Sequence, residues 1–149
     1  MRRLLSALVV TLPVAGVAAA PPIDEAIVAK LQKQGMSAEQ IRGSYDACDS
    51  GGPQSMKICF RYRLEGEEMR LDRIFNRLKI QIPAKFGDDA LKWLGKSEAA
   101  WQLLRDAHCN LETATTNFDY GPVVLACEWQ MTKQRADELQ KFSERFSDE

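Results

Sequence analysis

The chain has 149 residues, of which 28% are charged, and its formal net charge is −1. Because basic and acidic residues are interspersed without a block of like charge, neither a nucleic acid nor an anionic membrane surface is indicated as a partner. The length suits one domain around one hydrophobic core.

Residues 1–19 have the pattern of a secretory signal peptide. Two arginines precede an apolar run from Leu4 to Val17, and alanines occupy positions 18–20. The run is shorter than the ~20 residues of a membrane span. We expect cleavage after Ala19 and export to the periplasm or the medium, with no membrane insertion afterwards. The expected mature chain, residues 20–149, is a single domain with 18 basic and 21 acidic residues.

Two short helices are predicted at the start of the mature chain. The first begins near Asp24, and Gly35 suits its C′ position. The second begins with a capping box from Ser37 to Gln40 and is expected to stop at the turn sequence DSGGP. The residues expected to point inward are Ile23, Ile27, Leu31, Ile41, Tyr45 and Cys48.

Three long helices follow in the prediction. The first runs from Gln54 to Ile82, where Pro83 ends it. The second runs from about Asp88 to Leu111, and after a loop the third opens at Gly121 with Pro122 at its first position. Their expected inner faces are Met56, Cys59, Phe60, Leu64, Leu71, Ile74, Phe75, Leu78 and Ile82 in the first, Leu91, Leu94, Glu98, Trp101, Arg105 and His108 in the second, and Val124, Cys127, Met131, Arg135, Leu139, Phe142 and Phe146 in the third.

Strand-like alternation is nowhere sustained, so the predicted fold class is all-α. We expect a small antiparallel bundle of three main helices, with one or two short helices before them. In an up-down-up arrangement, the four cysteines, Cys48, Cys59, Cys109 and Cys127, collect at one end. An even number of cysteines in an exported chain predicts two disulfides. All three pairings are open, but Cys48–Cys59 and Cys109–Cys127 need the least rearrangement, and each would stabilise the fold by ~3 kcal/mol.

The sequence offers little support for catalysis. Neighbouring helical residues such as His108 and Cys109 point ~100° apart, so they do not form a base and nucleophile pair. No second histidine exists to join His108 on a metal. Glu98 and Asp106 are separated by about 12 Å along a helix and lie on different faces, which does not suit a glycosidase-like pair. Without a phosphate loop, HExxH or GxSxG motif, we expect no enzyme, no metal and no cofactor.

Charged residues on the apolar stripes are more informative. Glu98 and Arg105 lie seven residues apart in line with Trp101. Buried charges are tolerated when they are paired and hydrogen-bonded, and Arg135 on the next helix offers a partner across the bundle. We expect a structural ion-pair network there. A polar binding pocket is the functional alternative.

Two cysteine-anchored motifs carry a family resemblance. Residues 101–109 contain W-x-x-x-R-D-x-x-C, and residues 127–139 contain C-x-x-x-x-T-x-x-R-x-x-x-L. In these motifs the chain resembles the LprI-type lysozyme inhibitor family, over roughly Cys48 to Phe142. The matching positions are Trp101, Arg105, Asp106, Cys109, Cys127, Thr132, Arg135 and Leu139. The family pattern D-x-x-L-N-x-x-Y is represented upstream by Glu68, Leu71, Asp72 and Phe75, and Glu98 stands where the family usually has Gln.

The resemblance implies an exported domain that binds a protein such as a lysozyme and inhibits it. Animal-type lysozymes are basic and have an acidic catalytic pair in an open cleft, so a rigid, mildly acidic protein can block that cleft. We hypothesise that the loop from Leu111 to Gly121, closed by Cys109–Cys127, contacts the partner through an aromatic and acidic tip, Phe118, Asp119 and Tyr120. The alternative is a solvated connector whose aromatic side chains fold back on the bundle.

Two further interpretations remain open. A non-inhibitory exported helical protein, either a periplasmic adaptor or an immunity protein against a secreted toxin, would also be small, disulfide-tied and without catalytic groups. An enzyme acting on peptidoglycan is the third interpretation.

Overall fold

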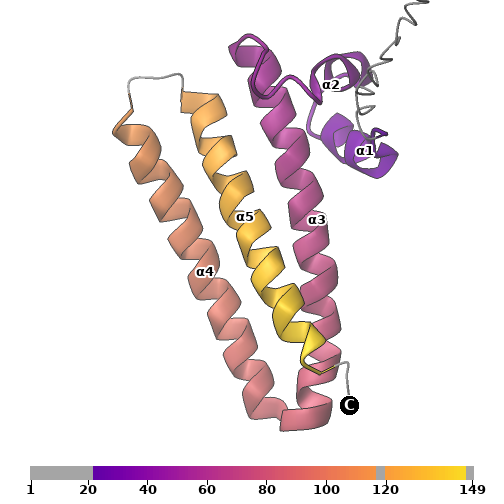
Figure 1. Cartoon of the computed structure of the whole chain (residues 1–149), viewed down its shortest axis with the longest axis vertical. Coiled ribbons are helices and arrows are strands. Elements are labelled where there is room, and N and C mark those ends of the chain that lie inside the picture. The colour runs from indigo at the N-terminus through magenta and orange to yellow at the C-terminus, as the bar shows by residue number, and fades with distance from the viewer. Residues whose placement is uncertain (1–21, 117–119, 147–149) are drawn as a thin grey trace, which may run out of the picture.

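Three long helices form an antiparallel bundle, and two short helices lie beside one end of it (Figure 1). The structure is a computed structural model that describes residues 22–116 and 120–146, without the side chain of Tyr120. The helices are α1 (Glu25–Lys33), α2 (Ala38–Ser44), α3 (Pro53–Phe86), α4 (Asp88–Ala114) and α5 (Tyr120–Glu144). The described residues contain no strand, so the predicted all-α class is confirmed.

The expected signal peptide, residues 1–19, lies outside the described residues. Its cleavage and the extent of the mature domain therefore remain predictions. Within residues 22–116 and 120–146, no helix combines the length and the apolar composition that crossing a membrane requires.

Local capping explains where the two short helices begin. Asp24 Oδ1 accepts a hydrogen bond of 2.8 Å from the backbone N–H of Ala26 at the start of α1. The predicted capping box of α2 is present, with Ser37 and Gln40 each accepting from the other's backbone N–H. Both sites satisfy N–H groups that a helix start leaves without partners.

Helix α2 ends at Ser44, before the predicted stop at DSGGP. Tyr45 and Cys48 therefore lie beyond the helix, although Cys48 is buried as expected. The turns after Ser44 bring Cys48 to Cys59 on α3, with 5.2 Å between their Cα atoms. The Cys48–Cys59 disulfide therefore fixes the end of this turn segment to α3.

Pro83 lies inside α3, so the prediction that it ends the helix was wrong. A proline removes one backbone hydrogen bond, but only one turn of α3 remains after it. The helix ends instead at Phe86, because Gly87 adopts a φ of +80° that favours glycine. The N–H of Gly87 donates to the carbonyl of Pro83 over 3.1 Å, and α4 begins at the next residue.

Two apolar clusters stabilise the two halves of α3. One cluster joins α1 and α2 to the start of α3, and the other joins the second half of α3 to α4 and α5. The buried members of the first are Ile27, Val28, Leu31, Ile41 and Ile58, and those of the second are Leu71, Ile74, Leu78, Ile82, Leu94, Ala136 and Leu139. Along α3, the buried carboxylate of Glu65 and the partly buried Glu68 lie between the clusters.

The inner faces of α4 and α5 agree with the predicted ones except at one residue of each helix. His108 was expected inside, but 57% of its side chain is exposed, and Cys109 is the buried residue instead. On α5, Phe142 is exposed, while Leu125, Thr132 and Ala136 are buried. Figure 1 shows α5 running alongside α3, so the stripe of α5 that faces α3 is the buried one.

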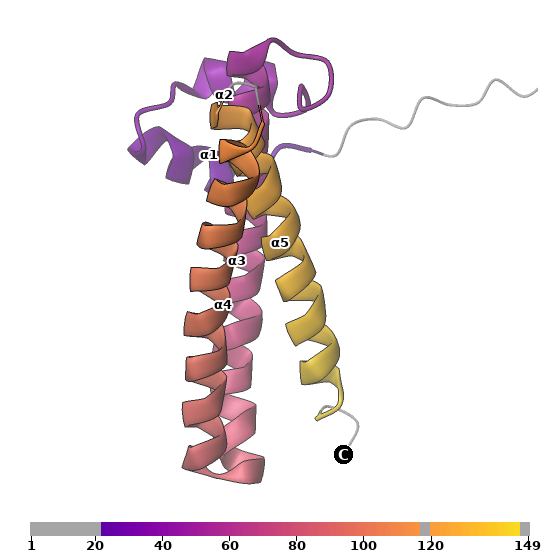
Figure 2. The same ribbon diagram turned by 90° about the vertical axis from the view of Figure 1, so that its left-hand side faces the viewer.

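The α4–α5 connection is shorter than the predicted loop from Leu111 to Gly121. Helix α4 continues to Ala114 and α5 already begins at Tyr120, so Pro122 is its third residue. The connector therefore comprises Thr115–Asp119. Figure 2 shows α4 and α5 close together at this connector end and diverging towards the other end.

Candidate functional site

Both disulfides lie at the connector end of the bundle, as the topology predicted. Cys48 pairs with Cys59, and Cys109 pairs with Cys127, with 5.5 Å between the Cα atoms of the second pair. These are the pairings that need the least rearrangement. The second disulfide joins the last turns of α4 to the start of α5 and closes the short connector between them.

A polar seam crosses the middle of the bundle, formed by Glu98, Trp101, Arg105, Thr132 and Arg135 (the motif seam). Arg135 Nε donates to Glu98 Oε2 over 3.1 Å, and its Nη2 donates to Ser97 Oγ over 3.0 Å. Only 8% of the Glu98 side chain is exposed, so the ion pair with Arg135 compensates a nearly buried charge. The expected cross-helix partner of Glu98 is therefore present.

Trp101 lies between the charged groups of the motif seam along α4. The guanidinium carbons of Arg105 and Arg135 lie 5.3 Å and 5.9 Å from the centroid of its ring. At these distances the electron-rich face of an indole attracts a cation. One aromatic ring thus links an arginine of its own helix to an arginine of α5.

Arg105 connects all three long helices. Its side chain donates to Thr132 Oγ1 on α5 over 3.2 Å and to its neighbour Asp106 over 3.0 Å. Its Nη1 also lies 3.6 Å from Glu68 Oε1 on α3. Burial raises the pKa of the Glu68 carboxyl, and the nearby Glu65 charge adds to that rise, although Arg105 opposes it.

A polar cavity of about 300 Å³ lies beside the motif seam, between α3 and α4. Its lining includes all four positions of the upstream family pattern, Glu68, Leu71, Asp72 and Phe75, but only Trp101 and Arg105 from the two cysteine-anchored motifs. Glu98 and Gln102 complete the lining. Because Glu98 and Arg105 already have protein partners, the seam primarily joins helices.

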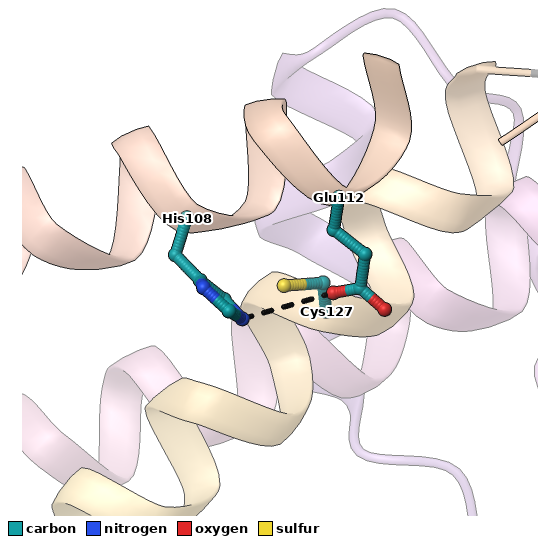
Figure 3. Close-up of side chains that lie close together, drawn as sticks. All are labelled: His108, Glu112 and Cys127. Atoms are coloured by element: carbon teal, nitrogen blue, oxygen red, sulfur yellow. Dashed lines mark ion pairs between the residues drawn. The ribbon is translucent and has the colours of Figure 1, made fainter. Parts of the chain in front are cut away.

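His108, Glu112 and Cys127 form the one group of possible metal-ligating side chains found among the described residues. Figure 3 shows them directed towards one another, with 3.9 Å between His108 Nε2 and Glu112 Oε2. Metals bind the thiolate form of cysteine, but the sulfur of Cys127 is bonded to Cys109. The group therefore does not fit a metal, and His108 and Glu112 are left as an exposed polar pair.

The outer face of α4 exposes several leucines near the second disulfide. The exposed fractions of Leu104 and Leu111 are 60% and 65%, and the two residues lie seven positions apart on one side of the helix. The exposed carboxylate of Glu112 lies next to Leu111 towards this side of α4, whereas Asp106 lies about 200° around the helix axis from Leu104 and contacts Arg105. This apolar and acidic surface, the α4 face, leads directly to the connector.

The hypothesised partner-binding tip comprises Phe118, Asp119 and Tyr120 at the connection between α4 and α5. Phe118 and Asp119 lie outside the described residues, and so does the side chain of Tyr120. Their contact with a partner stays a hypothesis.

A comparison with known families matches residues 46–139 to the family described as Lysozyme inhibitor LprI. The match covers well over half of the chain. The chain belongs to the LprI family. The matched LprI region contains all four cysteines, the whole motif seam and the α4 face. A search of curated proteins and a search of solved structures found no match.

Sequence reasoning missed two features of this LprI site. It found Arg135 as a partner for Glu98, but it did not find Glu68 as a partner for Arg105, because three positions of the upstream pattern are altered in this chain. It also missed the cation contacts of Trp101, although the spacing of Trp101 and Arg105 by four residues was a usable signal.

Proposed function

We propose that the chain is an exported inhibitor of a lysozyme that covers the active-site cleft with the connector end of the bundle, and that it has no enzymatic activity of its own. Membership of the LprI family supports the inhibitory role. The observation that carries the proposal is the α4 face, which places the exposed Leu104 and Leu111 beside the carboxylate of Glu112 at a disulfide-closed end.

Charge and rigidity both favour this mode of binding. The catalytic site of a lysozyme is an open cleft with two carboxylates, and animal-type lysozymes are basic overall. The exposed carboxylate of Glu112 complements a basic partner, which favours encounter. The Cys109–Cys127 disulfide reduces the conformational entropy that the connector loses on binding. Phe118 and Tyr120 would act as aromatic anchors at its tip.

A peptidoglycan clearing assay tests the proposal. The oxidised protein from Ala20 onward, titrated against an animal-type lysozyme, should abolish lysis at near-equimolar concentration. Leu104→Lys combined with Leu111→Lys should raise the inhibitory concentration by about tenfold or more, because it removes apolar contacts and adds positive charge facing a basic partner.

Ile80→Lys is the matched control, because Ile80 is also an exposed apolar residue, with an exposed fraction of 75%, but lies on α3. It should inhibit like the wild type. The combination of Asp119→Ala and Tyr120→Ala tests the tip separately, and wild-type inhibition by a folded, oxidised form of that variant would refute the tip contact.

The other interpretations predict different results in the same assay. An exported adaptor or immunity protein would leave lysis unchanged even in excess. An enzyme acting on peptidoglycan would clear the substrate without added lysozyme.

A further inference from the structure

We propose that the end of the bundle opposite the disulfides is a second binding site, which takes an acidic amphipathic helix of another protein. The site is an apolar groove between α4 and the second half of α5, where Figure 2 shows the two helices diverging. It is separate from the α4 face, and this inference does not depend on the proposed inhibition of lysozyme.

The groove is large for a domain of this size and its walls are mainly apolar. Its volume is about 870 Å³, at the upper end of the ~300–1,000 Å³ typical of binding pockets. Trp93 on α4 is 67% exposed and Phe86 is 54% exposed, so aromatic rings remain open to water. On α5, the ring centroids of Phe142 and Phe146 lie 4.9 Å apart. Exposed aromatic groups of this kind mark binding surfaces.

Positive charges lie on the α5 wall of the groove and at its α4 rim, where Lys96 is next to Trp93 but outside the lining. Lys96 Nζ on α4 lies 4.5 Å from the centroid of the Trp93 ring, and Arg145 Cζ lies 6.0 Å from that of Phe142. Lys141 lines the same wall as Arg145. Lys96, Lys141 and Arg145 have no ion-pair partner within the described part of the chain. Glu138, the carboxylate of the lining, lies 3.5 Å from Arg135 and is partly neutralised by it.

These features define the occupant. An apolar floor with a basic wall on α5 and Lys96 at the α4 rim complements a helix with one apolar stripe and carboxylates on both sides of it. From Ala90 to Ser97 the groove extends about 10 Å, which is about two helical turns. A helix would leave its polar side in water, whereas an acyl chain in so open a groove would stay half exposed. A second copy would bring like charges together, and a basic lysozyme would be repelled.

The test uses a synthetic peptide as the probe. A dye-labelled helical peptide of about 14 residues, with leucines at helical spacing and glutamates on both sides, is titrated with the oxidised protein from Ala20 onward. Fluorescence anisotropy should show saturable binding. Trp93→Ala, and Lys96→Glu combined with Arg145→Glu, should each weaken binding by about tenfold or more.

Two controls make the result specific. Arg73→Glu combined with Lys79→Glu changes the same charge at exposed positions of α3 outside the groove, and it should bind like the wild type. A peptide with lysines in place of the glutamates should bind at least about tenfold more weakly. Equal binding of both peptides, unchanged binding by the groove variants, or binding only to anionic phospholipid vesicles would overturn the proposal. The Lys96→Glu, Arg145→Glu variant should still inhibit lysozyme, so the two proposals can fail independently.

Discussion

The ion pair between Glu98 and Arg135 is the most demanding contact of the motif seam, because 8% and 13% of these side chains are exposed. Two charges removed from water stabilise a fold only when each compensates the other. Glu98 is a carboxylate and not an amide, so Arg135 faces a full charge here. Removing one partner should therefore lower the free energy of unfolding by more than the intact ion pair contributes to it.

Arg135→Gln is expected to lower the free energy of unfolding by about 3 kcal/mol, since it leaves the Glu98 charge buried without a cation. Adding Glu98→Gln should restore at least half of the loss, because the amide carries no charge. Urea denaturation of the single and double variants measures both effects. The control is Lys92→Gln, whose ion pair with Asp89 is exposed and should be worth less than about 1 kcal/mol. Equal losses in Arg135→Gln and Lys92→Gln would contradict this account.

Glu68 predicts a pH dependence of stability. Burial raises its pKa above the ordinary value of 4.5, so the folded state holds the proton more tightly than the unfolded state. The stability from this group is full below pH 4.5 and is lost as the pH rises through the raised pKa. Glu68→Gln cannot ionise, so its free energy of unfolding relative to the wild type should increase between pH 4 and pH 7.

Asp137 provides a control of opposite sign for this pH series. Hydrogen bonds from Arg70 and Lys133 lower its pKa below 3.8, so its contribution is present above that pH and is lost as the pH falls. Asp137→Asn should therefore lose stability relative to the wild type as the pH rises. Urea titrations at each pH measure both variants, and a flat difference for Glu68→Gln would rule out the burial effect.

At the residue scale, the sequence predicted which charges lie in the seam better than it predicted their partners. Glu98 was paired correctly because both it and Arg135 fall on predicted apolar stripes of neighbouring helices. Glu68 was not predicted as the partner of Arg105, because the sequence identified it only as a position of the upstream family pattern. Contacts across three helices depend on helix rotation, which the sequence of one helix does not determine.

At the scale of helices, order and number were predictable, while rotation and ends were less so. Turn sequences and the Ser37 capping box mark the breaks between helices independently of packing. Helix α4, in contrast, has apolar residues around much of its circumference, including the exposed Leu104 and Leu111. Periodicity alone therefore predicted that His108 faces the core. The disulfide of Cys109 turns that next residue inward instead, and His108 is exposed.

Removing either disulfide should lower stability by a similar amount, but only one of them should be needed for inhibition. Each closes a short loop, with sequence separations of 11 and 18, so replacing either pair by serines should lower the free energy of unfolding by about 3 kcal/mol. Cys109→Ser with Cys127→Ser frees the connector and should also abolish lysozyme inhibition. The variant with Cys48→Ser and Cys59→Ser should still inhibit lysozyme at a temperature at which this variant is folded. Urea titration and the clearing assay measure the two effects, and equal inhibition by both variants would contradict the connector's role.

At the scale of the whole molecule, α4 is the least firmly packed of the long helices. Its buried residues are Leu94, Glu98, Cys109 and Thr113, whereas α3 buries eight residues. Few buried apolar contacts make a segment prone to local opening. Covalent attachment at Cys109 and the ion pair at Glu98 therefore hold much of α4 in place.

Hydrogen exchange should show this difference in packing. Backbone amides of α4 between Leu94 and Arg105 should have lower protection factors than those of α3 between Leu64 and Leu78, because α4 can open without disrupting the α3–α5 contact. Exchange followed by NMR on the oxidised protein measures both segments. Equal protection in α3 and α4 would show that the bundle opens as one unit.

Gly87 limits how the length of this chain can vary. It is the single residue between α3 and α4, and its φ of +80° suits glycine. One residue inserted into α4 just after this corner would turn the rest of the helix by about 100°. Such a turn would carry Glu98 away from Arg135 and Cys109 away from Cys127. Insertions and deletions among relatives should therefore accumulate in the connector, residues 115–119, and avoid the Gly87 corner.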